Sequence, residues 1–195
     1  MANLLIDCAA VGQVRLRHWI CSDAEGIARL LQDKPLQRCL PGTPSTCSTA
    51  YAADLIAEAA AKWAKGRCIS LAICHASDGR LLGEVSLNLL SKEVGIWLGA
   101  EYWRCGHGRS AIQALLRFAQ FGLGVNSAHA LIRRDNPSSQ ALFEKCGFVF
   151  AGLQHGGIDQ GFVPSLKYQW YATLGTGRIL AGATRDNSLH HALQD

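Results

Sequence analysis

The stretch of this sequence with the clearest chemical potential runs from Val94 to Ala111, VGIWLGAEYWRCGHGRSA. It begins with alternating apolar side chains, which predict a strand, and continues into a turn that contains Gly106 and Gly108. After the turn, apolar residues recur at helical spacing. The N–H groups that open a helix have no partner within it, and the helix dipole adds about half a positive charge there. We therefore expect the segment from Arg104 to Arg109 to bind a phosphate-bearing cofactor.

The elements that position this turn are predicted from periodicity and turn residues. Ser77-Asp78-Gly79 joins two strands as a hairpin, and Ser22 with Glu25 matches a capping box at a helix start. Asn136-Pro137 suits another helix start, because Asn caps a helix and Pro fits its first position. The segment 34–49 holds three prolines and is predicted to be mostly loop, with a short helical turn left open. Strands are predicted at residues 14–20, 68–75, 80–90, 92–98, 127–133, 148–153 and 165–172, and helices begin near residues 22, 51, 107 and 136.

Length and composition favour one globular domain. The chain has 195 residues, of which 49% are hydrophobic and 17% charged, a balance typical of a packed core. A net charge of +4 is too small to indicate nucleic-acid binding but suits an anionic ligand. No apolar run approaches the ~20 residues that span a membrane, and the first residues lack the basic region of a signal peptide. We expect a cytoplasmic protein with one domain over residues 1–174, a tail at 175–195, and neither a nucleic-acid nor a membrane partner.

The eight cysteines show no spacing typical of a metal site. None forms a Cys-x-x-Cys pair, and none lies at zinc-finger distance from a histidine. Most occur in apolar runs, where a cysteine acts as a small buried hydrophobe. No metal is expected.

Two segments taken together resemble a known family. YWRCGHGRSAIQALLRFAQFGLG, followed by RRDNPSSQALFEKCGF, is similar to the GNAT superfamily of acetyl-CoA-dependent N-acetyltransferases. The nearest branch is the RimJ/RimL-like one, which includes acetyltransferases of ribosomal-protein N-termini. The resemblance covers roughly residues 13–174. It implies an α+β fold with a central, mostly antiparallel twisted sheet of about seven strands, splayed at the acetyl-CoA site and flanked by about four helices.

The resemblance also implies which backbone groups bind the cofactor. The family's pyrophosphate motif, Gln/Arg-x-x-Gly-x-Gly/Ala, matches the segment from Trp103 to Gly108, with Trp103 in place of the leading Gln or Arg. The strand before the turn would pair with the pantetheine arm like an added strand, through Ile96, Trp97 and Leu98. The N–H groups that would hold the pyrophosphate belong to Arg104, Cys105, Gly106, His107, Gly108 and Arg109.

The helix that begins after Asn136 carries the family's second motif, Asn-x-x-Ser. In the family the Asn contacts the pantetheine region, and the Ser bonds the thiol or acts as the acid; here these residues are Asn136 and Ser139. Many members also have a Tyr in this helix that protonates the departing thiolate. The matching residue is Phe143, which is assigned to the cofactor site but has no proton to give. Ser139 or a water is therefore the expected acid.

Acetyl transfer requires a neutral amine, a donor to the developing oxyanion and an exit for the thiolate. The family's Glu-Ile-Gly-Tyr-Trp pattern matches Glu93-Val94-Gly95-Ile96-Trp97, so Glu93 is the preferred general base, acting through water. Glu84 is the alternative base. His129 and His155 are further groups that titrate near neutral pH.

The expected reaction is direct attack of a primary amine on acetyl-CoA in a ternary complex. The segments 34–49 and 152–164, expected to shape the acceptor cleft, hold few acids beyond Asp159, which favours a peptide N-terminus or a small amine of low charge. A non-catalytic GNAT-like CoA-binding module remains open, since Phe143 replaces the tyrosine. A dinucleotide-binding oxidoreductase also remains open, because the glycine turn fits that fingerprint, although the turn follows a predicted meander. The sequence leaves monomer and homodimer open.

Overall fold

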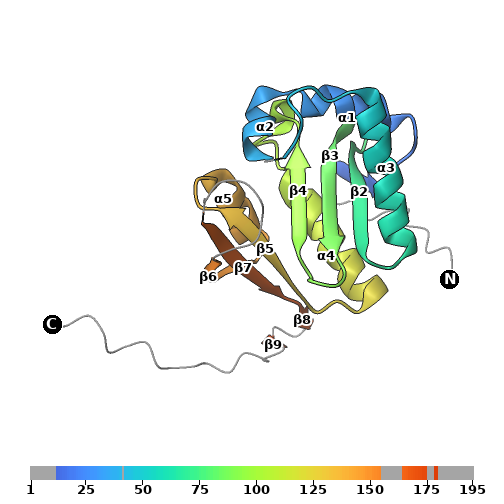
Figure 1. The fold of residues 1–195 in the computed structure, drawn as a ribbon. Helices are drawn as coiled ribbons and strands as arrows, with labels where there is room; N and C mark the ends of the chain where they lie inside the picture. The colour runs from blue at the N-terminus through green and yellow to red at the C-terminus, as the bar shows by residue number, and fades with distance from the viewer. Residues whose placement is uncertain (1–11, 41, 155–163, 175–177, 180–195) are drawn as a thin grey trace.

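The computed structural model describes residues 12–40, 42–154, 164–174 and 178–179, and its strands form two antiparallel sheets that lie side by side (Figure 1). The first sheet has the order β1-β2-β3-β4, and the second has the order β5-β7-β6. The predicted α+β class and the seven strands are confirmed. A short pair, β8 (Thr173–Leu174) and β9 (Arg178–Ile179), follows them. The seven strands are β1 (Val14–Arg17), β2 (Cys68–His75), β3 (Leu81–Asn88), β4 (Val94–Leu98), β5 (Ser127–Arg133), β6 (Val149–Gln154) and β7 (Ser165–Tyr171).

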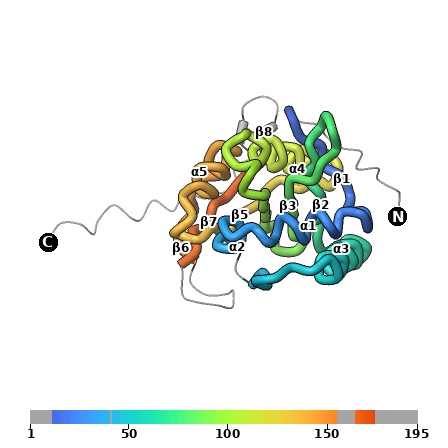
Figure 2. The backbone as a smooth tube through the Cα atoms, turned by 90° about the horizontal axis from the view of Figure 1, so that it is seen from above, coloured from blue at the N-terminus to red at the C-terminus, as the bar shows by residue number. Residues whose placement is uncertain are grey.

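Helices cover both faces of the first sheet. Figure 2 shows α4 on one side of β2 and β3 and α1 and α3 on the other side. Helix α5 packs against β5 of the second sheet and against α4. The helices are α1 (Asp23–Leu31), α2 (Lys34–Cys39), α3 (Thr49–Ala64), α4 (His107–Leu123) and α5 (Pro137–Lys145), and a 3₁₀ turn, η1, spans Ala100–Tyr102.

The described chain has one helix more than the roughly four that were expected. The additional helix is α2, in the segment predicted to be mostly loop. Its proline, Pro35, occupies the first turn of the helix, where a missing N–H costs nothing. This helix takes the place of the short helical turn that the sequence left open in the segment.

The start of α1 also differs from the expectation. Ser22 precedes the helix but makes no side-chain capping bond. Its neighbour Asp23 is buried, accepts a hydrogen bond from the Ile20 N–H at 3.0 Å, and pairs with both terminal nitrogens of Arg17 at 2.7 Å. A buried carboxylate with these partners fixes the chain entering α1 in place of the predicted capping box.

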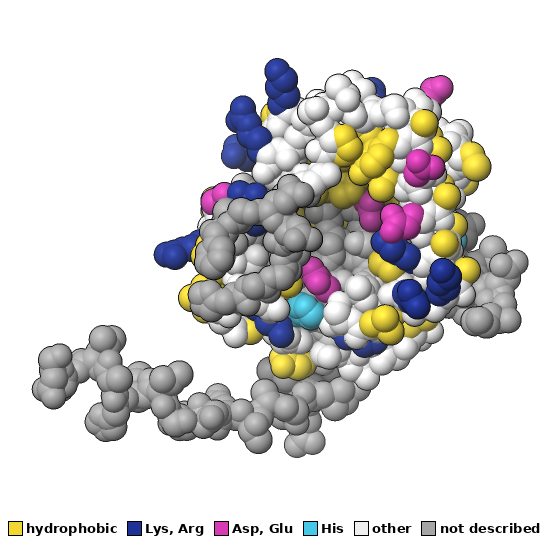
Figure 3. Space-filling model, viewed as in Figure 1, with side chains coloured by type: hydrophobic (Ala, Val, Ile, Leu, Met, Phe, Trp, Pro, Cys, Tyr) yellow, Lys and Arg dark blue, Asp and Glu magenta, His cyan; other side chains and the backbone are white. Residues whose placement is uncertain are grey.

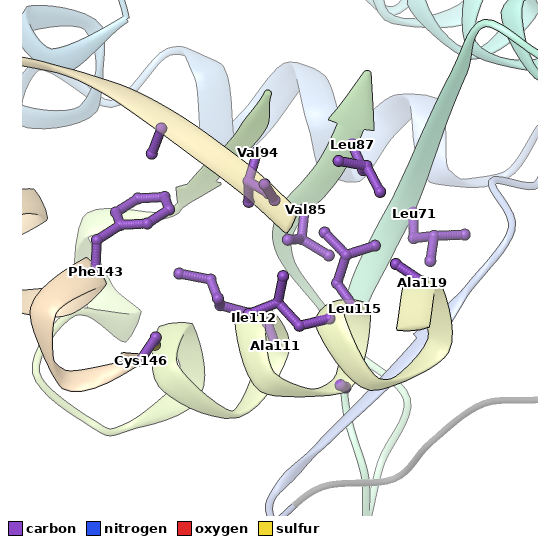
Figure 4. Close-up of a cluster of buried hydrophobic side chains, with 14 of the residues drawn as sticks. Leu71, Val85, Leu87, Val94, Ala111, Ile112, Leu115, Ala119, Phe143 and Cys146 are labelled. Carbon is purple, nitrogen blue, oxygen red and sulfur yellow. The ribbon is translucent and has the colours of Figure 1, made fainter. Parts of the chain in front are cut away.

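Two apolar clusters hold the layers together. The larger lies between the first sheet and α4. Figure 4 shows Ile112 and Leu115 of α4 beside Leu71 and Val85 of the sheet, with Phe143 entering from α5. The smaller cluster joins the opposite face of the sheet to α1, α2 and α3. Strand β2 thus buries both of its faces, and its alternate residues belong to the two different clusters.

The expectation that most cysteines are buried holds only in part. Cys47, Cys74 and Cys146 are buried, whereas Cys21 and Cys105 are exposed. In the described ranges, no group of three or more His, Cys, Asp or Glu side chains is arranged to hold a metal ion. Among the helices described, none is both long and apolar enough to cross a membrane.

Candidate functional site

The turn before α4 is held in an unusual backbone conformation. Arg104 has a φ of 61° and Gly106 a φ of 83°, both in the left-handed region, where glycine is favoured and arginine is uncommon. Such residues aim successive N–H groups to one side, which is how backbone nests bind anions. The predicted glycine turn is therefore present, and its shape suits an anion.

The N–H groups of this turn lack partners. The first hydrogen bond of α4 runs from the Ser110 N–H to the Gly106 carbonyl at 3.1 Å. Within the part of the chain that the structure describes, none of the six N–H groups from Arg104 to Arg109 has a hydrogen-bond acceptor. The side chains of Arg104 and Arg109 are exposed beside them. These groups offer an anion six backbone donors and two guanidinium groups.

His107 and Gly108, the first two residues of α4, are both buried. His107 is buried, and its Nδ1 atom has no hydrogen-bond partner among the described residues. Burial lowers the pKa of His107, and nearby His75 and Arg80 lower it further, so its imidazole is neutral near pH 7. A Cβ on Gly108 would lie 3.1 Å from Leu142 Cδ2, so the glycine allows α4 to begin close to α5.

Strand β4 presents an open edge beside the turn. It is the last strand of the first sheet, paired only with β3 among the strands described. Hydrogen bonds at both ends of the β3–β4 pairing, from Asn88 N–H to Glu93 O and from Gly99 N–H to Leu82 O, show which residues of β4 bond to β3. Because bonded and non-bonded pairs alternate along an antiparallel pair, the backbone N–H and C=O of Ile96 face away from β3. Of the three residues expected to face the pantetheine arm, Ile96 and Leu98 point to the open edge.

Two details of this edge were not expected. The carbonyl of Leu98 already accepts a hydrogen bond from the Trp103 indole at 2.7 Å. Trp97 bonds to β3 through its backbone, and its side chain lies on the sheet face opposite α4, where its Nε1 donates to Glu84 at 3.0 Å. The open backbone groups are therefore those of Ile96 and the Leu98 N–H.

The helix α5 places the second motif near the same edge. The Asn136 side-chain oxygen accepts a hydrogen bond from the Ser139 N–H at 3.1 Å, which makes Asn136 the N-cap of α5. Its amide nitrogen remains available to a ligand. Ser139 is half-buried. Phe143 is only 3% exposed and packs edge-on against Phe148, with ring centroids 4.9 Å apart, so its ring belongs to the core.

The two candidate general bases occupy different places on one sheet face. Glu93 lies just before β4, where its backbone forms an isolated parallel bridge with His129 of β5. Glu84 of β3 is in register with Trp97, farther along β4 toward the glycine turn. Burial raises the pKa of the Glu84 carboxyl, and hydrogen bonds from Ser70 and Trp97 oppose that rise. Burial lowers the pKa of His129, and the positive charge of Lys167 lowers it further, while the negative charge of Glu93 raises it.

The surface is hollowed where the two sheets meet. Figure 3, in the view of Figure 1, shows this hollow in front of β4, with acidic side chains at its margin. Sequence reasoning missed two of its structural supports, Trp19 and Ser70, which connect to Glu84 by hydrogen bonds. The register of β2 and β3 places Ser70 and Glu84 on one face of the sheet, and only the structure shows that register. His155 and Asp159 lie outside the described residues.

The architecture conflicts with the dinucleotide interpretation of the glycine turn. That fingerprint belongs to the first βαβ unit of a parallel sheet. Here the turn follows β2, β3 and β4, which pair with one another in antiparallel fashion. The donor-rich turn instead follows the open-edged strand β4 after only the short 3₁₀ turn η1.

Comparison with family models matches residues 13–149 to the acetyltransferase (GNAT) domain. Comparison with curated protein sequences finds no significant match. Among solved structures, the microcin C7 self-immunity acetyltransferase MccE, in complex with acetyl-CoA and AMP, superposes with a TM-score of 0.77. It is 17% identical, and the match covers 87% of this chain and 98% of that chain.

Two ribosomal-protein-type acetyltransferases are also similar in fold. RimL, the ribosomal L7/L12 alpha-N-protein acetyltransferase in complex with CoA, has a TM-score of 0.74 and 18% identity, over 83% of this chain and 96% of that chain. RimJ of Mycobacterium smegmatis, in complex with CoA-disulfide, has a TM-score of 0.74 and 19% identity, over 85% of each chain. At identities of 17% to 19%, these similarities show a shared fold and nothing finer.

Proposed function

Because this chain belongs to the GNAT acetyltransferase family, we propose that it transfers the acetyl group of acetyl-CoA directly to a primary amine in a ternary complex. The observation that carries the proposal is the pairing of six unpartnered N–H groups, from Arg104 to Arg109, with the open edge of β4 within the described structure. The first feature suits a pyrophosphate and the second suits an amide-bearing arm. Acetyl-CoA contains both.

We assign the cofactor groups as follows. The pyrophosphate binds the N–H groups of residues 104–109, and the pantetheine arm pairs with Ile96 and the N–H of Leu98. Asn136 contacts the arm through its amide nitrogen, since its oxygen is engaged in the helix cap. Trp97 and Phe143 support this region from the sheet face and the core.

For the chemical step, the amine nitrogen attacks the thioester carbon, the C–S bond breaks, and the thiolate leaves with a proton. Glu93, acting through water, takes the amine proton, and the Ser139 hydroxyl supplies the proton to the thiolate while it regains a proton from solvent water. Donors aimed at the developing oxyanion come from the open edge of β4. We place this reaction in a single domain over residues 1–174, of which the family model matches 13–149.

The acceptor is a peptide N-terminus or a small-molecule amine. RimL, which shares the fold, is an alpha-N-protein acetyltransferase by name, and this supports the peptide class. A non-catalytic CoA-binding module is the second candidate, favoured by the buried Phe143, which has no proton to donate.

The test is free-thiol release from acetyl-CoA by the full chain, with a panel of N-terminally free peptides and simple primary amines. Amine-dependent thiol release is the expected result. Binding of acetyl-CoA without turnover of any acceptor would favour the binding module, and absence of acetyl-CoA binding would contradict both.

A further inference from the structure

A chain of hydrogen bonds crosses the face of the first sheet that lies opposite α4. The Glu84 carboxyl accepts one bond from the Ser70 hydroxyl at Oε1 and one from the Trp97 indole at Oε2, each at 3.0 Å. The Ser70 hydroxyl oxygen in turn accepts a bond from the Trp19 indole at 2.9 Å. The four residues come from the segment after β1 and from β2, β3 and β4. The carboxylate is therefore held in one orientation by three elements of the sheet.

This carboxylate still has the capacity to bind a cation. An ionised carboxyl group offers about four acceptor sites, and the two bonds to Glu84 use only two of them. Among the described residues, no Lys or Arg nitrogen lies within 4.0 Å of it, and Lys62, on the neighbouring helix, pairs with Glu58 at 2.8 Å. Burial raises the pKa of Glu84, and the hydrogen bonds from Ser70 and Trp97 and the more distant charge of Lys62 oppose that rise without cancelling it. An incoming positive charge would relieve that cost.

Its location fits an incoming amine. Glu84 is in register with Trp97, on the strand next to the open edge of β4, and adjacent strands lie about 4.8 Å apart. Glu84, Trp97 and Trp19 are each half-buried as residues, so part of each reaches solvent, while the Glu84 carboxyl group itself lies deep enough for burial to raise its pKa. Figure 3 shows the surface hollowed in front of β4, with acidic side chains at the margin of the hollow.

We propose that Glu84, held by Ser70 and Trp97, is the docking site for the ammonium group of the acceptor, with the Trp19 and Trp97 indoles beside it. The ligand class is a primary amine that arrives protonated, presents one ammonium group to one carboxylate, and releases one proton to solvent water before its neutral nitrogen attacks the thioester. This inference rests on the proposed acetyltransferase function, and it gives Glu84 a binding role separate from the proton transfer assigned to Glu93.

The test measures binding of an acceptor to the full chain saturated with CoA, by isothermal titration calorimetry. The probe is the peptide amide Ser-Ala-Ala-NH₂. Its partner probe is the same peptide with an aminooxy group in place of the α-amine, which is uncharged near neutral pH. The variants are Glu84→Gln and, as a matched charge control, Glu25→Gln on the exposed face of α1.

Glu84→Gln is expected to weaken binding of the ammonium probe by about 10- to 100-fold, the range of a lost hydrogen bond to a charged group. The aminooxy probe is expected to bind the wild-type and Glu84→Gln proteins equally, and Glu25→Gln is expected to bind both probes as the wild type does. In turnover, the same change should raise KM for the amine more than it lowers kcat.

Equal binding of the ammonium probe by the wild-type and Glu84→Gln proteins would overturn the docking role, as would failure of the CoA-loaded wild type to bind that probe. Loss of affinity for both probes alike would also overturn it, because charge would then not be what is recognised. The preceding titration with CoA keeps the two claims apart: absence of CoA binding contradicts the proposed function, whereas CoA binding with an unaffected Glu84→Gln variant contradicts only the docking role.

Discussion

The backbone of Glu93 forms a parallel bridge with that of His129, and this bridge is the one pairing between the two sheets in the described structure. The His129 N–H donates to the carbonyl of Lys92 at 2.9 Å, and Lys92 adopts a left-handed φ of 65°. Beyond this point β4 and β5 share no ladder. The open edge of β4 therefore begins at a fixed junction, and Glu93 stands at its closed end.

Substitution of Gly106 by alanine tests the turn. A side chain at a left-handed φ costs roughly 1–2 kcal/mol, and relief of that strain would rotate the N–H groups away from the anion. We expect Gly106→Ala to lower the melting temperature and to weaken acetyl-CoA binding at least tenfold, measured by calorimetry.

The matched control for this change is Gly124→Ala at the other end of α4. Gly124 has a φ of 67° and open space around it, so its substitution carries the same backbone strain. It should lower stability similarly and leave acetyl-CoA affinity unchanged. Equal effects of the two variants on affinity would show that the turn has no special role.

Two substitutions of Asn136 can separate its role as a helix cap from its role in cofactor binding. Asn136→Ala removes the acceptor of the Ser139 N–H and should cost about 1 kcal/mol of stability, as lost N-caps do. Asn136→Asp keeps that acceptor and should retain stability. Both variants lose the amide donor, so both should bind acetyl-CoA more weakly. Full affinity in Asn136→Asp would mean that Asn136 acts only as a cap.

Ser139 has an exposed neighbour in Ser138, which makes a close control. If the Ser139 hydroxyl protonates the thiolate, Ser139→Ala should reduce kcat by about 10²- to 10⁴-fold, with little change in acetyl-CoA affinity. Ser138→Ala should behave as the wild type does. Steady-state thiol release measures both, and an undiminished kcat in Ser139→Ala would transfer the role of acid to water.

The pKa of Glu84 predicts how stability depends on pH. Because burial raises that pKa in the folded state, Glu84 favours folding most when it is protonated, and this contribution is lost as the pH rises through its folded pKa. Glu84→Gln carries no charge to desolvate. The margin between its melting temperature and that of the wild type should therefore move in favour of the variant as the pH rises above the ordinary carboxyl range. A margin that is constant with pH, or that moves in favour of the wild type as the pH rises, would contradict the raised pKa.

The sequence predicted those parts of the molecule that depend on local signals. The glycine turn, the Asn136 cap and the alternation in β4 each follow from neighbouring residues, and the structure has them where they were expected. For the segment that holds Lys34–Cys39 the sequence left only a short helical turn open, and the structure has a helix there because its proline occupies the first turn, where it does not interrupt a helix. Ser22 was expected to cap α1, but Arg17 and Asp23 fix the helix start through a contact six residues apart.

The interior of the candidate site was harder to predict because it depends on strand register. A sequence shows which residues share a face within one strand. The contact of Ser70, Glu84 and Trp97 also requires β2, β3 and β4 to align at one level. The separation of β4 from β5 is likewise a tertiary feature, visible only where the Glu93 bridge ends. The burial of Phe143 against Phe148 also depends on how α5 packs.

The central claim, that acetyl-CoA binds along the β4 edge and the glycine turn, is tested most directly by amide hydrogen exchange of the full chain with and without saturating acetyl-CoA. The account predicts slower exchange at residues 104–109 and at Ile96, since these N–H groups would gain acceptors on the cofactor. Amides at the far end of α4, near Gly124, should exchange at the same rate in both conditions. Unchanged exchange at residues 104–109 in the presence of bound acetyl-CoA would contradict the account.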